Sequence, residues 1–581
     1  MARARARQKQ QAAIPPVPLL PRISPRTWLG LALLALALIL GTWSRVVQVS
    51  SVDFLDADAT IAYLQSAGHA GQDWSNAVAG PERLTDRWVQ AREWKRLLEA
   101  DFPPPLARIW RDQSTDVHPP LYYVLLGTWR AWFGQGMRTG IAFNIPVAAM
   151  TMLAVFGLVL MATKDSLHAA LAAGFFAAMP AALTGVTTAA KMYELLALWT
   201  VLLAIAVLVY VRGKRRHEYL AAGGLALLSV LGMLTHVLFA LSLVLAVVWL
   251  VVGVLTQRDS TGRVRRLGLA LGAVVFGVAI AAVIYPSLLQ GPARTLTMGG
   301  QYTLGTPSGS ASARAEWLRS LIGDGILGAQ AAGWVFSTIT AGIGLVLISL
   351  VIGSALAVYV ASSRDDHPGT AFSIEQLQST AGSSWPLVLA VGSAAVVPIV
   401  LLGWGYMTSR MPYLSARYLA QAMPFVAAGL VLAVRAIRRP AASAVMAAYV
   451  MLLLAASLLS CLPGMFPQPT VVPAEELADA TNLVVDTGDL SYLPKVLVLI
   501  PDDTMVYVSS SQDDLASSRS VWEPAIGPGT HYVSFPIREN TVEGGSAIAT
   551  EMGGGRGVDS IVLSPYGEML SPDMATLWVV R

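Results

Sequence analysis

Charged residues are scarce in this chain. Asp, Glu, Lys and Arg make up 13% of its 581 residues, whereas soluble proteins contain about a quarter. Hydrophobic residues make up 55%, and uncharged apolar runs such as Leu195–Val211 and Ala441–Leu459 approach the roughly 20 residues that cross a bilayer. This composition excludes a soluble multidomain enzyme, a disordered chain and a nucleic-acid binder. The sequence predicts an α-helical polytopic membrane protein, with membrane lipids among its partners and no nucleic acid.

Cysteine is nearly absent too, since Cys461 is the one example. A disulfide framework within the chain is therefore excluded, and cysteine usage says nothing about the redox compartment. The sequence has no Cys/His set at metal-ligand spacing. Its C-terminal part has no Walker loop, dinucleotide fingerprint, serine-nucleophile elbow or zinc motif. The sequence thus establishes no cofactor and leaves a divalent metal open.

Basic residues are scarce in the last fifth of the chain. From Met465 to Arg581 there are 16 acidic and 5 basic residues, whereas the rest of the chain has 35 basic and 20 acidic residues. The two parts are therefore expected to face different surroundings. We predict a basic cytoplasmic arm at 1–27, a transmembrane domain at 28–463 with outer loops at 50–118 and 290–333, and a small extracytoplasmic α/β domain at 464–581.

Short basic segments predict the orientation. They lie at 212–217, 258–266 and 435–439, and the positive-inside rule places them in the cytoplasm with the N-terminus. This arrangement requires that Leu121–Phe133, about 13 residues long, does not cross the bilayer, so we expect it at the outer interface. The result is a multi-pass protein of the plasma membrane with about eleven transmembrane helices. The predicted spans are 28–47, 141–161, 167–187, 193–210, 219–234, 237–255, 267–289, 334–360, 385–407, 418–434 and 441–459.

Two segments outside the spans have recognisable local patterns. Leu84, Trp88, Trp94 and Leu98 recur at helical spacing, which predicts that 81–100 forms an amphipathic helix on the bilayer surface. The C-terminal part contains short β-like runs separated by turn residues. These runs are 496–500, 505–509, 531–535, 560–563 and 577–580.

Unusual polar residues gather on the predicted outer side. Snorkelling side chains are expected at both faces of a membrane, so a one-sided set of carboxylates, imidazoles and cations indicates a reaction centre. The set consists of Asp53, Asp56, Asp58, Asp116, His118, Lys191, Tyr193, His236, Arg410 and Arg417.

Asp56-Ala57-Asp58 follows directly after the first predicted span. A carboxylate at the membrane edge can deprotonate an acceptor hydroxyl as a general base, and a pair of carboxylates can hold a divalent cation. A solvated surface carboxylate is the ordinary alternative.

Asp116-Val117-His118-Pro119-Pro120 is the most specific stretch of the chain. The double proline fixes the entry into the short helix that follows. His118 then lies at the N-terminus of that helix, where the dipole and the free amides favour anions. A merely structural turn would explain the prolines but not the adjoining Asp and His.

The segment 116–129, DVHPPLYYVLLGTW, resembles the signature of GT-C membrane glycosyltransferases related to protein O-mannosyltransferases and aminoarabinose transferases. Three later landmarks are similar to theirs, and the resemblance covers roughly 28–439. Relatives usually have an Asp-Glu pair where this chain has Asp56-Ala57-Asp58, so Asp58 and Asp56 both stay candidates. The landmarks are Lys191-Met192-Tyr193, Leu234-Thr235-His236 and Ala416-Arg417-Tyr418-Leu419.

The resemblance implies an inverting glycosyltransferase of GT-C type that moves a sugar from a polyprenyl-phosphate-linked donor to a glycan, lipid or protein acceptor at the outer face. Asp58 or Asp56 would activate the acceptor. Fixed cations and hydrogen-bond donors stabilise a departing phosphate in a dehydrated site. The candidates for the donor phosphate are Lys191, Arg417, Tyr193 and His118, and those for a metal or for the acceptor are Asp116 and His236.

A polytopic transporter or flippase for lipid-linked sugars is the alternative, because transporters also carry charges within the membrane. Transporters usually have internal repeats and charges near the bilayer midplane. This sequence has no obvious repeat, and its polar set lies at one surface. Lys191 and Arg417 could each also be ordinary snorkelling residues at the ends of spans.

Overall fold

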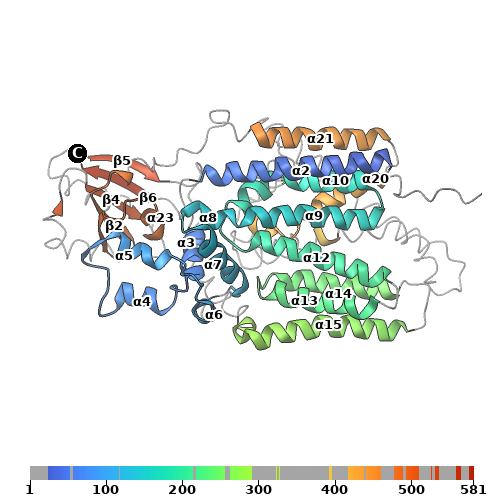
Figure 1. Cartoon of the computed structure of the whole chain (residues 1–581), viewed down its shortest axis with the longest axis horizontal. Helices are drawn as coiled ribbons and strands as arrows, with labels where there is room; N and C mark the ends of the chain where they lie inside the picture. Colours follow the sequence, from blue (N-terminus) through green and yellow to red (C-terminus); the bar gives the residue numbers. More distant parts are fainter. Residues whose placement is uncertain are drawn as a thin grey trace, which may run out of the picture.

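The computed structural model describes a helical bundle with a six-stranded sheet beyond one of its ends (Figure 1). We call the end of the bundle next to the sheet the sheet end. The described residues are 24–52, 57–114, 116, 118–213, 217–255, 262–290, 319, 322, 326, 392–394, 416–436, 440–459, 477–487, 493–509, 525–526, 530–535, 558–563 and 575–580.

The bundle consists of apolar helices that match the predicted spans. Among the described residues, four helical stretches are long and apolar enough to cross a membrane, and five more apolar helices are shorter. The predicted spans 334–360 and 385–407 lie outside the described residues, apart from 392–394, so the total of about eleven stays a prediction. The helices are α2 (Pro25–Ser50), α9 (Asn144–Thr163), α10 (Ser166–Ala178), α12 (Tyr193–Arg212), α13 (Glu218–Met233), α14 (Phe239–Leu255), α15 (Arg263–Ile284), α20 (Met423–Ala436) and α21 (Pro440–Leu459).

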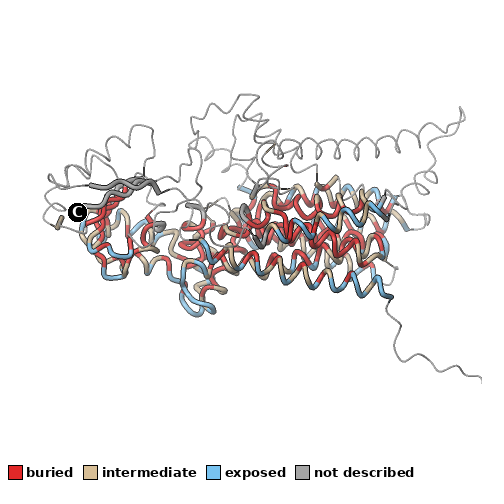
Figure 2. The backbone as a smooth tube through the Cα atoms, turned by 90° about the horizontal axis from the view of Figure 1, so that it is seen from above, coloured by how far each residue is buried: buried red, intermediate tan, exposed pale blue. Residues whose placement is uncertain are grey.

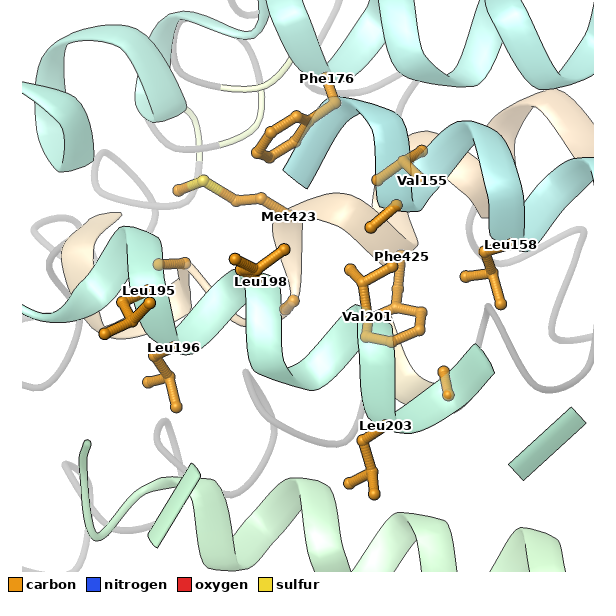
Figure 3. Close-up of a cluster of buried hydrophobic side chains, with 14 of the residues drawn as sticks. Val155, Leu158, Phe176, Leu195, Leu196, Leu198, Val201, Leu203, Met423 and Phe425 are labelled. Carbon is orange, nitrogen blue, oxygen red and sulfur yellow. The ribbon is translucent and has the colours of Figure 1, made fainter. Parts of the chain in front are cut away.

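Aliphatic and aromatic side chains fill the space between these helices. Phe176 of α10, Val155 of α9, Leu198 of α12 and Phe425 of α20 belong to one buried cluster (Figure 3). Buried residues run along the interior of the bundle (Figure 2). Side chains packed this way gain dispersion contacts and exclude both lipid and water.

The predicted span 167–187 is interrupted. The helix α10 ends at Ala178, and a short helix α11 (Pro180–Ala182) and a π-helical turn η2 (Leu183–Thr187) follow it. Pro180 explains the break, because proline has no N–H for the helical ladder and its ring clashes with the preceding turn. The chain from η2 to α12 is therefore free to form a loop.

The basic segments gather at the end of the bundle opposite the sheet. Arg26 of α2 forms an ion pair of 2.7 Å with Asp165, between α9 and α10. The same α9–α10 junction accepts hydrogen bonds from Arg212 (2.8 Å, to the Met161 carbonyl) and Arg435 (3.3 Å, to the Thr163 carbonyl). These contacts bring Arg26, Arg212 and Arg435 to one end of the bundle, whereas the membrane topology and the cytoplasmic side of that end stay predictions.

A layer of short helices separates the bundle from the sheet (Figure 1). The helix α7 has the bounds predicted for the interface helix, and its N-terminus is tied to the end of α13 by a backbone hydrogen bond from Leu121 to Leu234 (3.0 Å). The layer contains α3 (Ala57–Ala67), α6 (Leu106–Gln113), α7 (Leu121–Phe133) and α8 (Met137–Ala142), whereas α4 (Gln72–Ala79) lies beside the sheet and packs Ala77 into the same cluster as Leu483.

The sheet joins the first outer loop to the C-terminal part of the chain. Its order is β1-β3-β2-β4-β6-β5, with β2 parallel to both β3 and β4 and the other pairs antiparallel. The edge strand β1 comes from the first outer loop and pairs Trp88 with Tyr507. The strands are β1 (Trp88–Gln90), β2 (Asn482–Thr487), β3 (Met505–Ser509), β4 (Thr530–Phe535), β5 (Val558–Leu563) and β6 (Ala575–Val580).

The amphipathic helix predicted at 81–100 is wrong. This segment forms β1, the short helix α5 (Ala91–Lys95) and the 3-10 turn η1 (Arg96–Leu98). Trp94 is fully buried in a cluster with Leu483 and Val506 of the sheet, so it packs on protein instead of lipid. Helical spacing of apolar residues did not reveal that a strand partner lies about 400 residues further along the chain.

Four of the five C-terminal β-like runs are confirmed as strands, and one is wrong. The runs 505–509, 531–535, 560–563 and 577–580 lie within β3, β4, β5 and β6. The run 496–500 is wrong, because its residues belong to the end of the helix α23 (Leu493–Leu497) and a turn. The sequence analysis missed β2. The domain boundary at 464 stays a prediction, since 460–476 lies outside the described residues.

Candidate functional site

Asp116 and His118 lie at the sheet end, in the turn that leads into α7. One Asp116 oxygen, Oδ1, accepts hydrogen bonds from the backbone N–H and from Nδ1 of His118, both at 3.0 Å. Burial alone would raise the pKa of Asp116, but the charge and hydrogen bonds of His118 and the charge of Lys191 hold it well below its usual range. Asp116 is therefore an anion that keeps the proton of His118 on Nδ1 and orients the ring.

Tyr193 is the first residue of α12, and Lys191 lies in the turn before it, which follows α11 and the π-helical turn η2. Both side chains are buried. The loop before them is held by Asn144 of α9, whose amide donates to the carbonyls of Thr187 (3.1 Å) and Ala189 (2.6 Å). The interrupted helix thus brings a cation and a phenol to the sheet end, and the amide fixes their loop.

His236 lies in the turn between α13 and α14. Its Nδ1 accepts a hydrogen bond of 2.9 Å from the backbone N–H of Leu238, so the ring proton lies on Nε2. This Nε2 is buried and has no hydrogen-bond partner among the described residues. Burial, followed by the charges of His118 and Lys191, lowers the pKa of His236 well below its ordinary value. His236 therefore presents a neutral N–H donor.

Ring contacts show that these segments meet. The His118 and His236 ring centroids are 5.6 Å apart, and Tyr193 is 5.5 Å from both His236 and Tyr418. The guanidinium carbon of Arg417 is 5.3 Å from the centre of the Tyr418 ring. Four separate stretches of sequence thus place two cations, two imidazoles and two phenols in one cluster at the sheet end.

The candidate bases are only partly described. Asp56 and Asp53 lie outside the described residues, as does Arg410. Asp58 is the second residue of α3, and its backbone is described without its side chain. The first turn of a helix stabilises a carboxylate through the free amides and the dipole. The role of Asp58 or Asp56 as the base stays a prediction.

Two members of the cluster were missed as functional candidates in the sequence. Tyr418 belongs to the same sequence landmark as Arg417, but the sequence assigned no role to Tyr418. Gln65 of α3 donates a hydrogen bond from Nε2 to Oδ2 of Asp116. An uncharged amide inside an apolar helix gives no compositional signal, although its spacing of seven residues from Asp58 places both positions on one helix face.

Among the described residues, the side chains of this cluster do not form a metal-binding group. Within the part of the chain that the structure describes, no group of three or more His, Cys, Asp or Glu residues could hold one. Both oxygens of Asp116 already accept hydrogen bonds, and the lone pair of His236 Nδ1 is used by a backbone N–H. A metal ligand needs such a lone pair.

No family model and no curated protein matches this chain. Among solved structures, it is similar to ArnT from Cupriavidus metallidurans in the apo state, with 15% identity over 96% of this chain and 98% of that chain and a TM-score of 0.38. A second structure of the same ArnT, bound to undecaprenyl phosphate, has 14% identity, the same coverage and a TM-score of 0.33. The archaeal oligosaccharyltransferase AglB from Archaeoglobus fulgidus, in complex with an inhibitory peptide and a dolichol-phosphate, has 12% identity over 87% of this chain and 69% of that chain, with a TM-score of 0.40.

Proposed function

We propose that this protein is an inverting glycosyltransferase that moves a sugar from a polyprenyl-phosphate-linked donor to an acceptor at the outer face of the membrane. The observation that carries the proposal is the cluster of Lys191, Arg417, His118, Tyr193 and His236 at one end of an apolar bundle. Cations and N–H or O–H donors held in a water-poor site suit a lipid phosphate. The apolar helices below them suit its hydrocarbon chain.

In the proposed reaction, the carboxylate of Asp58 or Asp56 takes the proton of an acceptor hydroxyl. The hydroxyl oxygen attacks the anomeric carbon from the face opposite the phosphate. The bond between that carbon and the phosphate oxygen breaks, and its electron pair leaves with the polyprenyl phosphate. The configuration at the sugar is inverted because the reaction is a single displacement.

Lys191 and Arg417 stabilise the charge that develops on the departing phosphate. Fixed charges act strongly in a dehydrated site because no solvent has to reorganise around them. Tyr193 donates a hydrogen bond to the same group, and the imidazolium form of His118 donates from Nε2 while its Nδ1–H stays on Asp116. His236 contributes a neutral N–H from Nε2, which suits a phosphate or an acceptor oxygen, and Asp116 orients His118. No step in this mechanism needs a metal ion.

The basic end of the bundle favours an orientation with the N-terminus in the cytoplasm. The sheet end, with the cluster and the C-terminal part, then faces the outside of the plasma membrane. The donor phosphate lies at the outer interface, where a soluble acceptor, a lipid or a cell-wall glycan can reach it.

The test uses the purified full chain with radiolabelled polyprenyl-phosphate sugars and a membrane extract as acceptor. We expect that Asp58→Asn, Asp56→Asn or the double variant loses transfer while binding of polyprenyl phosphate persists. Asp101→Asn is a matched control, since Asp101 is an exposed carboxylate of the same outer loop. Normal transfer in both single variants and the double variant would refute the base assignment. Movement of intact lipid-linked sugar across vesicles without transfer would favour the flippase.

A further inference from the structure

Gln65 and Asp58 lie on the same short helix, α3 (Ala57–Ala67). Seven residues make nearly two turns, so the two positions lie on one face of the helix about 10 Å apart along its axis. The helix therefore carries a candidate base at its first turn and a buried amide near its last turn. Gln65 is 3% exposed.

The Gln65 amide reaches the turn that presents His118. Its Nε2 donates to Oδ2 of Asp116, and the other oxygen, Oδ1, accepts both N–H groups of His118. A carboxylate held from both sides has little freedom to rotate. The three side chains Gln65, Asp116 and His118 thus form a continuous link from α3 to the cluster.

A second link fixes α3 further from the cluster. Arg130 of α7 donates to the carbonyl of Tyr63 (3.1 Å) and to the hydroxyl of Ser66 (3.0 Å). Arg130 lies nine residues beyond Leu121, the first residue of α7, which corresponds to about 13 Å along the helix. Arg130 therefore ties the C-terminal half of α3 to α7, whereas Gln65 ties the same half to the His118 turn.

We propose that Gln65 is a positioning residue that aligns the helix of the base with the phosphate-binding turn. This inference rests on the proposed function. An inverting displacement needs the base, the acceptor oxygen, the anomeric carbon and the phosphate in one line. A misplacement of about 1 Å costs on the order of 100-fold in rate. Gln65 touches neither substrate, and it acts through Asp116 and His118.

The first test is Gln65→Leu, which keeps the side-chain size and removes the amide. We expect kcat to fall about 10- to 100-fold, as for other residues that orient a ligand-binding side chain. The Kd for polyprenyl phosphate should change less than threefold. Gln113→Leu is the matched control, since neither buried amide atom of Gln113 has a hydrogen-bond partner in the part of the chain that the structure describes. This control should leave kcat unchanged.

The second test reverses the polarity of the hydrogen bond. Gln65→Glu puts two carboxylates against each other and should lose most activity. Adding Asp116→Asn lets the new amide donate to Glu at position 65, while its carbonyl still accepts from His118. The double variant should therefore be more active than Gln65→Glu alone, a coupling that only interacting residues show.

Two results would overturn the inference. One is an unchanged kcat in Gln65→Leu. The other is a parallel loss of kcat, of polyprenyl phosphate affinity and of thermal stability without recovery in the double variant, which would assign Gln65 a merely structural role. Failure of the proposed function is distinguishable, because the unmodified protein would then neither bind polyprenyl phosphate nor transfer sugar.

Discussion

Replacing Arg130 by methionine should loosen α3, because this one buried guanidinium holds the helix. Arg130 is 1% exposed and donates to the Tyr63 carbonyl, the Ser66 hydroxyl and the Leu98 carbonyl. Its guanidinium carbon also lies 4.1 Å from the centre of the Tyr63 ring. Burial lowers the pKa of Arg130 to about 10, against the opposing effects of Tyr63 and Glu99, so the group is charged at pH 7.

The magnitude follows from these contacts. A hydrogen bond from a charged donor contributes about 1.5 kcal/mol or more, and a buried cation–π contact adds about 1–2 kcal/mol. The desolvation of the guanidinium offsets part of this sum. We expect Arg130→Met to lower the free energy of opening α3 by about 3 kcal/mol, net of that offset. A change of this size accelerates exchange through local opening by more than about 100-fold.

The assay is hydrogen exchange of the α3 amides in detergent at pH 7, read by mass spectrometry. Arg96→Met is the control, because Arg96 pairs with Glu93 on the exposed surface of the same loop and such pairs contribute little. Exchange in α3 that changes less than threefold in Arg130→Met would refute the reasoning. So would an equal acceleration in Arg96→Met.

Three further predictions concern the cluster and the sheet. Lys191→Met and Arg417→Met should each weaken polyprenyl phosphate binding by about 10-fold or more, as measured by ligand titration. Unchanged Kd values would show that both residues are ordinary snorkelling residues and do not bind the phosphate. His236 has a pKa well below 6.5, so the folded state binds fewer protons than the unfolded state, and stability is full above pH 6.5 and falls below it. His236→Gln should flatten this fall in melting curves between pH 7.5 and 5.5, and an identical slope would contradict the assignment. Trp94→Ala should destabilise the sheet by about 3–5 kcal/mol, and unchanged proteolysis of the C-terminal part would contradict that estimate.

The helices could be predicted from sequence because a membrane demands a simple composition. Long uncharged runs form helices in lipid, where every backbone group needs an internal partner. The uncharged run across Pro180 predicts one span, whereas the proline itself is the local signal of the break. The prediction of a helix at 81–100 was wrong for a different reason. The apolar spacing at Trp88 fits a helix as well as a strand, and the pairing that decides between them involves Tyr507.

The sequence could predict that the polar residues of the cluster lie at one end of the bundle. It could not predict the hydrogen bonds and tautomers within the cluster. Positive-inside counting predicted His118, Lys191 and His236 at one end. In the structure the rings of His118 and His236 are in contact, and the charge of Lys191 acts on His236. The tautomer of His236 depends on the backbone N–H of Leu238, which has no signature in sequence. Gln65 was missed because its importance comes from one hydrogen bond across a turn.

The charge balance of the cluster argues for an anionic ligand. Lys191 and Arg417 bring two positive charges to the sheet end, whereas Asp116 is the one carboxylate whose described side chain lies in the cluster. Glu194 follows next along α12, but the charge of Arg45 acts on it inside the bundle, so it offsets a different cation. Both Asp116 oxygens already accept hydrogen bonds, and within the described part of the chain the N–H of His236 Nε2 has no acceptor. A phosphate brings the negative charge and the oxygen acceptors that this arrangement of donors lacks, and a neutral ligand would bring only part of them.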